Sequence, residues 1–205
     1  MSLFHEMTKK PWLVDPVGAE GVQEVGAFFL PHGKVGLRVF LVVVTVIFTL
    51  MTIAYADRML FANWLPMPEP WVLWLNTALL IVSGIAMQVA RNGAQQDNIS
   101  GVRDGLVWAG VLTVAFLTGQ LYVWQQMVDL GYYANTNTAN AFFYLLTAIH
   151  GLHMAGGLVA WWRSFSRMWR GASVTDIRLS VELCTTYWHY LLLIWLVLFA
   201  LLLLS

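Results

Sequence analysis

The chain has 205 residues, of which 59% are hydrophobic and only 11% are charged, with eleven tryptophans and a mean hydropathy of +0.67. Soluble domains carry about 25% charged residues, so most of this chain has to avoid water. The net charge of zero gives no indication of nucleic-acid binding, and the single cysteine, Cys184, excludes an internal disulfide and a cysteine cluster.

Residues 1–32 lack the uninterrupted apolar core of a signal peptide, and we expect them to form a retained cytoplasmic arm. Beyond the arm, crossing the roughly 30 Å hydrocarbon core of a bilayer requires about 20 helical residues. Five apolar segments reach that length, at residues 36–56, 71–90, 105–128, 139–162 and 179–204. The sequence therefore predicts one all-α, polytopic membrane domain of five transmembrane helices over residues 33–205.

The distribution of lysine and arginine predicts the orientation of these helices, because cytoplasmic segments retain basic residues. If the N-terminus is inside, ten basic residues fall in inner segments and only Arg58 falls in an outer one. The inner residues are Lys9, Lys10, Lys34, Arg38, Arg91, Arg103, Arg163, Arg167, Arg170 and Arg178. This split predicts a cytoplasmic N-terminus and a C-terminus outside, and it supports an odd number of spans.

Four titratable side chains fall inside the expected spans, where such groups face the bundle interior or a cavity. His150 and His153 are three residues apart, whereas Glu182 and His189 share one stripe of the last helix with Thr186. At about 1.5 Å per residue, His153 and His189 lie at the same depth. We expect them to make a polar contact between the fourth and fifth helices.

Three imidazoles at mid-membrane depth allow two interpretations. They resemble ligands for copper, zinc or haem, or they form hydrogen bonds between helices. No carboxylate or thiolate set accompanies them, and no nucleotide, zinc-protease or nucleophile motif occurs. The sequence therefore favours structural contacts, with no metal and no catalytic centre in this chain. Asn76 and Gln120 are further polar residues inside the spans, and we expect them to make interhelical contacts as well.

Small residues recur along the fourth span at the spacing that lets helix backbones approach closely. The first series is Thr147, Gly151 and Ala155, and the second is Gly156 and Ala160. We expect this face to pack against another helix of the chain or against a partner subunit.

Several segments together resemble the subunit III family of haem-copper oxidases. They are WVLWLNTALLIVSGIAMQVA, FLTGQLYVWQQMVDLG, AFFYLLTAIHGLHMAGGLVA and VELCTTYWHYLLLIW, within a resemblance that covers residues 33–204. The five spans look like the last five of the family's seven-helix members, as in the shorter bacterial forms. The positions that match family motifs are Asn76, Gln120, Trp124, His150, Gly151, His153, Gly157, Glu182, Tyr187, Trp188, His189 and Trp195.

This resemblance implies a non-catalytic subunit of a respiratory terminal oxidase in the bacterial inner membrane. Such a subunit docks on catalytic subunit I, is associated with subunit II and other respiratory-complex subunits, and supports stability and proton uptake during oxygen reduction. Haem and copper are then expected in the partner subunits. For the matching residues, Trp188 included, the resemblance implies packing, interhelical hydrogen bonds and contacts to phospholipid.

Two positions depart from the family's pattern. The first retained helix usually carries a buried acid in a pattern like FLxSE, and this chain has Val44 at that position. The family's YWHFVD is YWHYLL here, with Leu192 replacing the acid. Both departures argue against proton conduction through this chain.

Three other functions stay open. Two are close relatives, namely the corresponding subunit of a quinol oxidase and the accessory protein of nitric oxide reductase. A small membrane transporter is a remote alternative, since no internal repeat is visible and prolines such as Pro66, Pro68 and Pro70 lie outside the spans.

Overall fold

The computed structural model describes residues 32–60 and 70–204, and the chain divides into two units, Met1–His32 and Gly33–Ser205. The described residues form five helices and no strand, which confirms the predicted all-α membrane bundle. The helices are α2 (His32–Met59), α3 (Val72–Gln95), α4 (Ile99–Asp129), α5 (Thr138–Trp169) and α6 (Val174–Leu203). The expected arm lies outside the described residues except for residue 32, so its role stays a prediction.

The last three helices extend beyond the apolar segments that predicted them. Helix α5 has 32 residues, which corresponds to about 48 Å and exceeds the roughly 30 Å hydrocarbon core. The apolar segment at 139–162 marks only the part inside the hydrocarbon. The helix continues toward Trp169 because backbone groups at the headgroup level are still best satisfied by helical hydrogen bonds.

Local sequence signals fix several helix ends. The side chain of Asn98 accepts a hydrogen bond from the N–H of Gly101 at 3.2 Å and caps the start of α4. Helix α5 ends at Trp169, and Gly171 just after it has a φ of +81°, the left-handed conformation that glycine adopts without strain. The N–H of the next residue, Ala172, then bonds back to the carbonyl of Arg167 at 3.2 Å, which completes a glycine C-cap.

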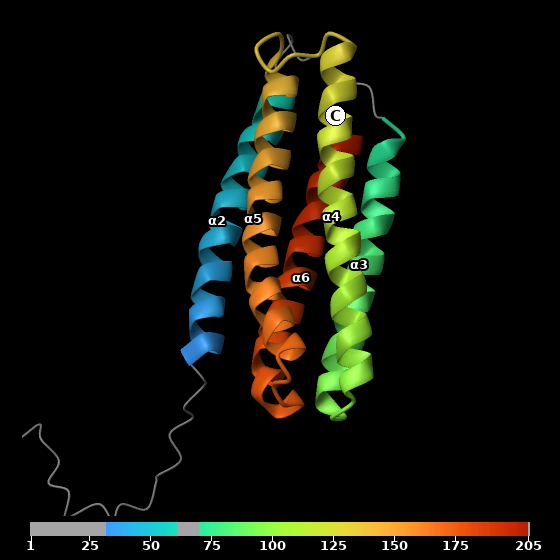
Figure 1. Ribbon diagram of the computed structural model, residues 1–205. Coiled ribbons are helices and arrows are strands. Elements are labelled where there is room, and N and C mark those ends of the chain that lie inside the picture. The colour runs from blue at the N-terminus through green and yellow to red at the C-terminus, as the bar shows by residue number, and fades with distance from the viewer. Residues whose placement is uncertain (1–31, 61–69, 205) are drawn as a thin grey trace, which may run out of the picture. The chain divides into compact units, whose positions relative to one another are not determined.

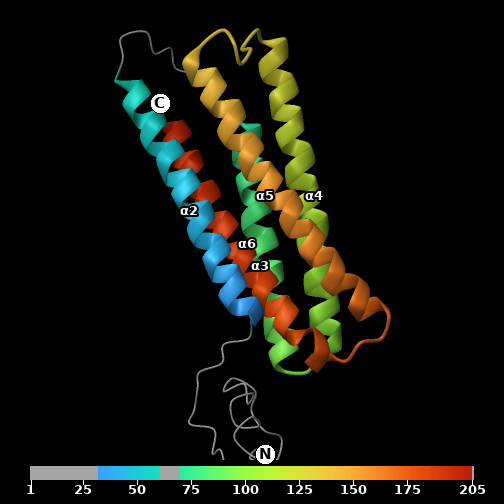
Figure 2. The same ribbon diagram turned by 90° about the vertical axis from the view of Figure 1, so that its left-hand side faces the viewer.

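The helices run alternately in opposite directions, so α2 begins at the end of the bundle opposite the one where α6 ends (Figure 1). Helix α3 packs against α4 and α6, and α5 packs against the same two helices. Figure 2 shows α2 running alongside α6. This order brings the start of α2, the end of α3 and the start of α6 to one end of the bundle.

Glycine allows α3 and α4 to approach closely. A Cβ added at Gly105 would lie 2.5 Å from the backbone nitrogen of Ala90 and 2.7 Å from the carbonyl oxygen of Ala86. No side chain fits between the two helices at this point. The core of the bundle holds fully buried large side chains, among them Trp188, Trp195 and Phe116.

Candidate functional site

Hydrogen bonds between helices form a polar cluster in the core. The indole N–H of Trp188 on α6 donates to Ser83 Oγ at 3.2 Å and to Thr113 Oγ1 at 3.1 Å. These two hydroxyl oxygens, from α3 and α4, are 2.8 Å apart, and all three side chains are buried. The cluster joins three helices without leaving the indole N–H unsatisfied, as buried tryptophan requires.

A second set of contacts lies along the same helices. Trp195 Nε1 donates to Thr77 Oγ1 at 3.0 Å, and Asn76 Nδ2 donates to Gln120 Oε1 at 3.4 Å. Asn76 also fills the space that a side chain at Gly119 would occupy. Asn76 and Gln120 are therefore brought together, as contacts between α3 and α4.

His150 lies in the core, fully buried, with aromatic rings around it. Its ring centroid is 5.1 Å from that of Trp195, 6.0 Å from that of Phe116 and 6.4 Å from that of Phe48. Within the part of the chain that the structure describes, neither ring nitrogen has a hydrogen-bond partner. An unsatisfied buried polar group is unfavourable, so this imidazole contributes mainly through packing with the rings.

His153 faces α2 beside this aromatic group. Its Nδ1 is 2.8 Å from the carbonyl oxygen of Ile149 on the same helix, and its ring lies 5.6 Å from that of Phe48 and 6.2 Å from that of Phe40. Val44 lies midway between these two phenylalanines in sequence, on the same face of α2, and is buried. An acid at position 44 would therefore point toward the two histidines, which is the contact that this chain lacks.

His189 lies on the exposed side of α6. Its Nδ1 is 2.9 Å from the carbonyl oxygen of Thr185, one turn earlier, and Thr186 on the same stripe is also exposed. A carbonyl only accepts hydrogen bonds, so Nδ1 carries the proton and Nε2 of the neutral ring is an acceptor. The expected contact between His153 and His189 is not found among the described residues, because each imidazole bonds to its own helix.

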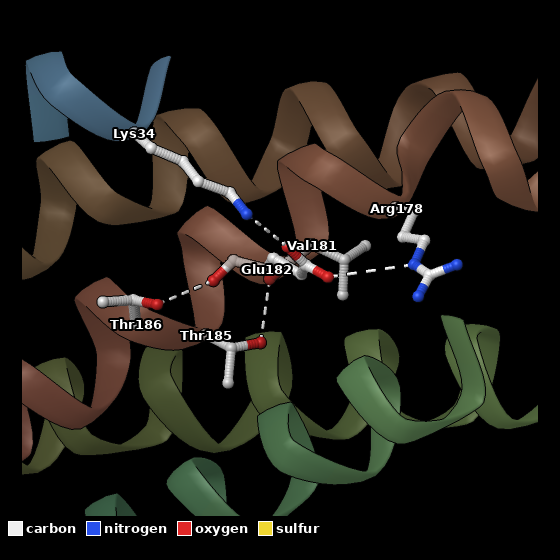
Figure 3. Close-up of polar contacts among 6 residues, drawn as sticks. All are labelled: Lys34, Arg178, Val181, Glu182, Thr185 and Thr186. Carbon is white, nitrogen blue, oxygen red and sulfur yellow. Dashed lines mark hydrogen bonds and ion pairs between the residues drawn. The ribbon is translucent and has the colours of Figure 1, made fainter. Parts of the chain in front are cut away.

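Glu182 forms two ion pairs at the start of α6 (Figure 3). Its carboxylate oxygens lie 3.2 Å from Lys34 Nζ on α2 and 3.8 Å from Arg178 Nε on its own helix. Sequence reasoning used Lys34 and Arg178 only to orient the chain and missed this cluster. The spacing of Arg178 and Glu182, one helical turn apart, indicates their ion pair in the sequence. No sequence feature indicates the pairing of Glu182 with Lys34.

The small residues of α5 divide between two environments. Thr147 is buried and accepts a hydrogen bond from Trp124 Nε1 at 3.0 Å, and a Cβ at Gly151 would meet only Leu117, at 3.9 Å. Ala155, Gly156 and Ala160 instead line an open, mainly apolar cleft of about 730 Å³ between α2, α5 and α6. The close helix contact falls at Gly157, where a Cβ would lie 2.8 Å from the ring of Tyr187.

The described residues contain no group of three His, Cys, Asp or Glu side chains that could hold a metal ion. The geometry defines a multi-pass helical membrane subunit joined internally by hydrogen bonds and aromatic packing. The profile of the family described as Cytochrome c oxidase subunit III matches residues 3–204. The chain belongs to this family, which confirms the resemblance in the sequence and makes the chain a subunit III of the haem-copper oxidases.

Individual relatives agree with this assignment. The chain is 30% identical over 175 residues to a protein named cytochrome c oxidase subunit 3 from Thermostichus vulcanus, covering 82% of this chain and 84% of the relative. A protein of the same name from Synechocystis sp. is 29% identical over 184 residues, which cover 83% of this chain and 76% of the relative. The cytochrome bo(3) ubiquinol oxidase subunit 3 of Pseudomonas aeruginosa is 26% identical over 137 residues, which cover 63% of this chain and 62% of the relative.

Proposed function

We propose that this chain docks on the catalytic subunit of an oxygen-reducing oxidase fed by cytochrome c, and that it supports the stability and proton uptake of that subunit during turnover. Haem and copper reside in the partner subunits, with subunit II and other respiratory-complex subunits nearby. The chain itself contributes no redox centre. The cytochrome c oxidase names of the relatives at 30% and 29% identity support this choice of electron donor.

The observation that carries the docking proposal is the exposure of His189 in the middle of α6. An imidazole facing lipid is costly, and ionisable groups within spans ordinarily face protein or a water-filled cavity. Its Nδ1 is already bonded to Thr185, which leaves Nε2 as the ring nitrogen that can accept a hydrogen bond from a partner. We infer that the catalytic subunit covers this face and supplies a donor, such as a hydroxyl, amide or indole N–H.

Substitution of His189 by leucine tests this docking face. A hydrogen bond between membrane helices averages about 0.6 kcal/mol, so the variant should bind the catalytic subunit about threefold more weakly. The measurement is the haem absorbance recovered per mole of this chain after affinity purification of the complex under mild detergent. Haem recovery equal to that of the parent would contradict the proposal.

Thr118 offers a matched control. It is an exposed polar residue of α4 whose hydroxyl donates to the carbonyl of Val114 at 2.9 Å on its own helix. Thr118→Val removes a polar group from another face, and it should leave haem recovery unchanged. The supporting role is tested separately, because oxidase depleted of this chain should lose activity faster per turnover than the intact complex. Equal rates of inactivation would refute that role.

The remaining assignments follow the same proposal. We place the chain in the bacterial inner membrane, with its N-terminus in the cytoplasm, because ten of its eleven basic residues fall on one side of the predicted spans. Oxidation of reduced cytochrome c by the purified complex is the assay for the electron donor. Activity with quinol alone would favour the ubiquinol-oxidase branch that one relative represents.

A further inference from the structure

The open cleft between α2, α5 and α6 reaches the middle of α5. Its volume of about 730 Å³ falls within the roughly 300–1,000 Å³ range of sites for small organic molecules. His153 lines the cleft and stands halfway along α5, a helix of 32 residues. At about 1.5 Å per residue, this imidazole lies more than about 20 Å from either end of the helix. A lipid headgroup, at the boundary of the hydrocarbon core, is out of its reach.

The polar groups that line the cleft are hydrogen-bond acceptors. His153 Nδ1 is 2.8 Å from the carbonyl oxygen of Ile149, so Nδ1 carries the proton and Nε2 of the neutral ring only accepts. Tyr187 donates its hydroxyl proton to the carbonyl oxygen of His153 at 3.0 Å, so its hydroxyl oxygen also accepts any further bond. Cys184 adds a weakly hydrogen-bonding thiol, 3.9 Å from Ser164 Oγ.

His153 Nε2 therefore needs a donor from outside the chain. None of the described residues forms a hydrogen bond with this nitrogen. An imidazole acceptor beside an apolar cavity is unfavourable until a donor meets it, and ionisable groups within spans mark sites of function for this reason. The ligand that fits is an apolar molecule with a hydroxyl group.

The other lining residues are suited to a flat ring. The ring of Phe40 lies 6.2 Å from that of His153 and 6.0 Å from that of Tyr187, which places three aromatic rings around the cleft. Opposite large side chains, Ala155 and Gly156 keep the α5 wall low, and a Cβ added at Gly156 would meet nothing within 4 Å. Because the cleft is open, an apolar tail can extend from it into the bilayer.

We propose that this cleft binds a quinol, the reduced form of a membrane quinone, with a ring hydroxyl donating to His153 Nε2. A quinol combines hydroxyl donors with an apolar ring and tail, whereas the oxidised quinone has carbonyls that only accept. The acyl chains that a phospholipid places at this depth have no donor at all. The quinol is a bound ligand and gives up no electron here. The site is independent of the docking face, which uses His189.

The test uses the purified full-length chain in detergent, with decylubiquinol kept reduced under argon and decylubiquinone titrated separately. Bound ligand is counted by native mass spectrometry. We expect the quinol to bind about fivefold more tightly than the quinone, as one neutral hydrogen bond provides. His153→Phe keeps an aromatic ring and should remove this preference, by weakening quinol binding about fivefold and leaving quinone binding unchanged.

A second pair of variants keeps the test decisive if His153→Phe disturbs the fold. Gly156→Leu fills the cleft from its open wall and should abolish binding of decylubiquinol. Gly36→Leu is the matched control, because a Cβ there also meets nothing within 4 Å and Gly36 does not line the cleft; it should bind like the parent.

Three outcomes would overturn the proposal. The first is equal affinity for quinol and quinone in the parent, and the second is quinol binding that Gly156→Leu leaves unchanged. The third is displacement of decylubiquinol by phosphatidylcholine at comparable concentration, which would show that the cleft accepts any apolar chain.

Discussion

Replacing Gly105 by alanine perturbs the closest approach between a described glycine and the backbone of another helix. The added Cβ would lie 2.5 Å from the backbone nitrogen of Ala90 and 2.7 Å from the carbonyl oxygen of Ala86. Backbone atoms cannot rotate away, so α3 and α4 must separate by roughly an ångström to restore ordinary contact. Overpacking costs about 1–3 kcal/mol, whereas alanine gains about 1 kcal/mol over glycine in a helix.

Because two whole helices have to move, we expect the overpacking term to dominate. The free energy of unfolding should fall by about 1–2 kcal/mol, which is the upper part of the overpacking range less the gain from alanine. Denaturant unfolding in detergent micelles, followed by tryptophan fluorescence and circular dichroism, measures this change. Gly156→Ala is the matched control, because a Cβ there meets nothing within 4 Å. The control should be neutral or more stable by up to about 1 kcal/mol; equal shifts in both variants would refute the close helix contact.

Three further predictions concern the first helix, His150 and the orientation. Residues 36–56 contain no acid, so a hydrophobic carbodiimide should spare them in the parent and modify them in Val44→Glu; an adduct on the parent segment would contradict this. His150→Phe should keep the free energy of unfolding within about 1 kcal/mol, because neither ring nitrogen has a partner among the described residues; a larger loss would show that one of the nitrogens does have a partner. Cysteine labelling should reach Arg167→Cys only from the cytoplasm and Ser205→Cys from outside, and the reverse pattern would refute the orientation.

The number and position of the helices follow from the sequence because membrane insertion depends on local hydrophobicity. Each apolar segment contains the information for its own span, so five segments predict five helices without knowledge of their packing. The caps were equally local, since Asn98 and Gly171 act on backbone groups within five residues of themselves. The polar segments between the spans, however, mark only where each helix leaves the hydrocarbon core of the bilayer, and the helices continue into these polar segments.

Which face of each helix points inward could not be predicted, because that depends on the shape of its neighbours. His150 and His189 both lie within spans, yet one is fully buried among rings and the other is exposed. The depth estimate for His153 and His189 concerns only their height along the bundle and contains no information on the rotation of either helix about its axis. Each imidazole bonds to a carbonyl one turn earlier, a local partner that spacing rules for helix pairs overlook.

Helix α2 is the least buried of the five described helices, and polar contacts join it to α6. Much of its surface is exposed, with Leu50 62% and Val42 63% accessible. Lys34 pairs with Glu182 near its start, and in its middle Thr45 Oγ1 lies 2.7 Å from Tyr190 Oη. The apolar side chains on its outer face gain little from leaving lipid, because lipid tails are equally apolar.

These few contacts explain how the missing acid at position 44 can be tolerated. Val44 is buried beside the phenylalanines that contact His153 and His150, so ring packing occupies the place where an ion pair or hydrogen bond would hold α2. Loss of the Lys34–Glu182 pair would let α2 move away from α6 and widen the cleft beside it.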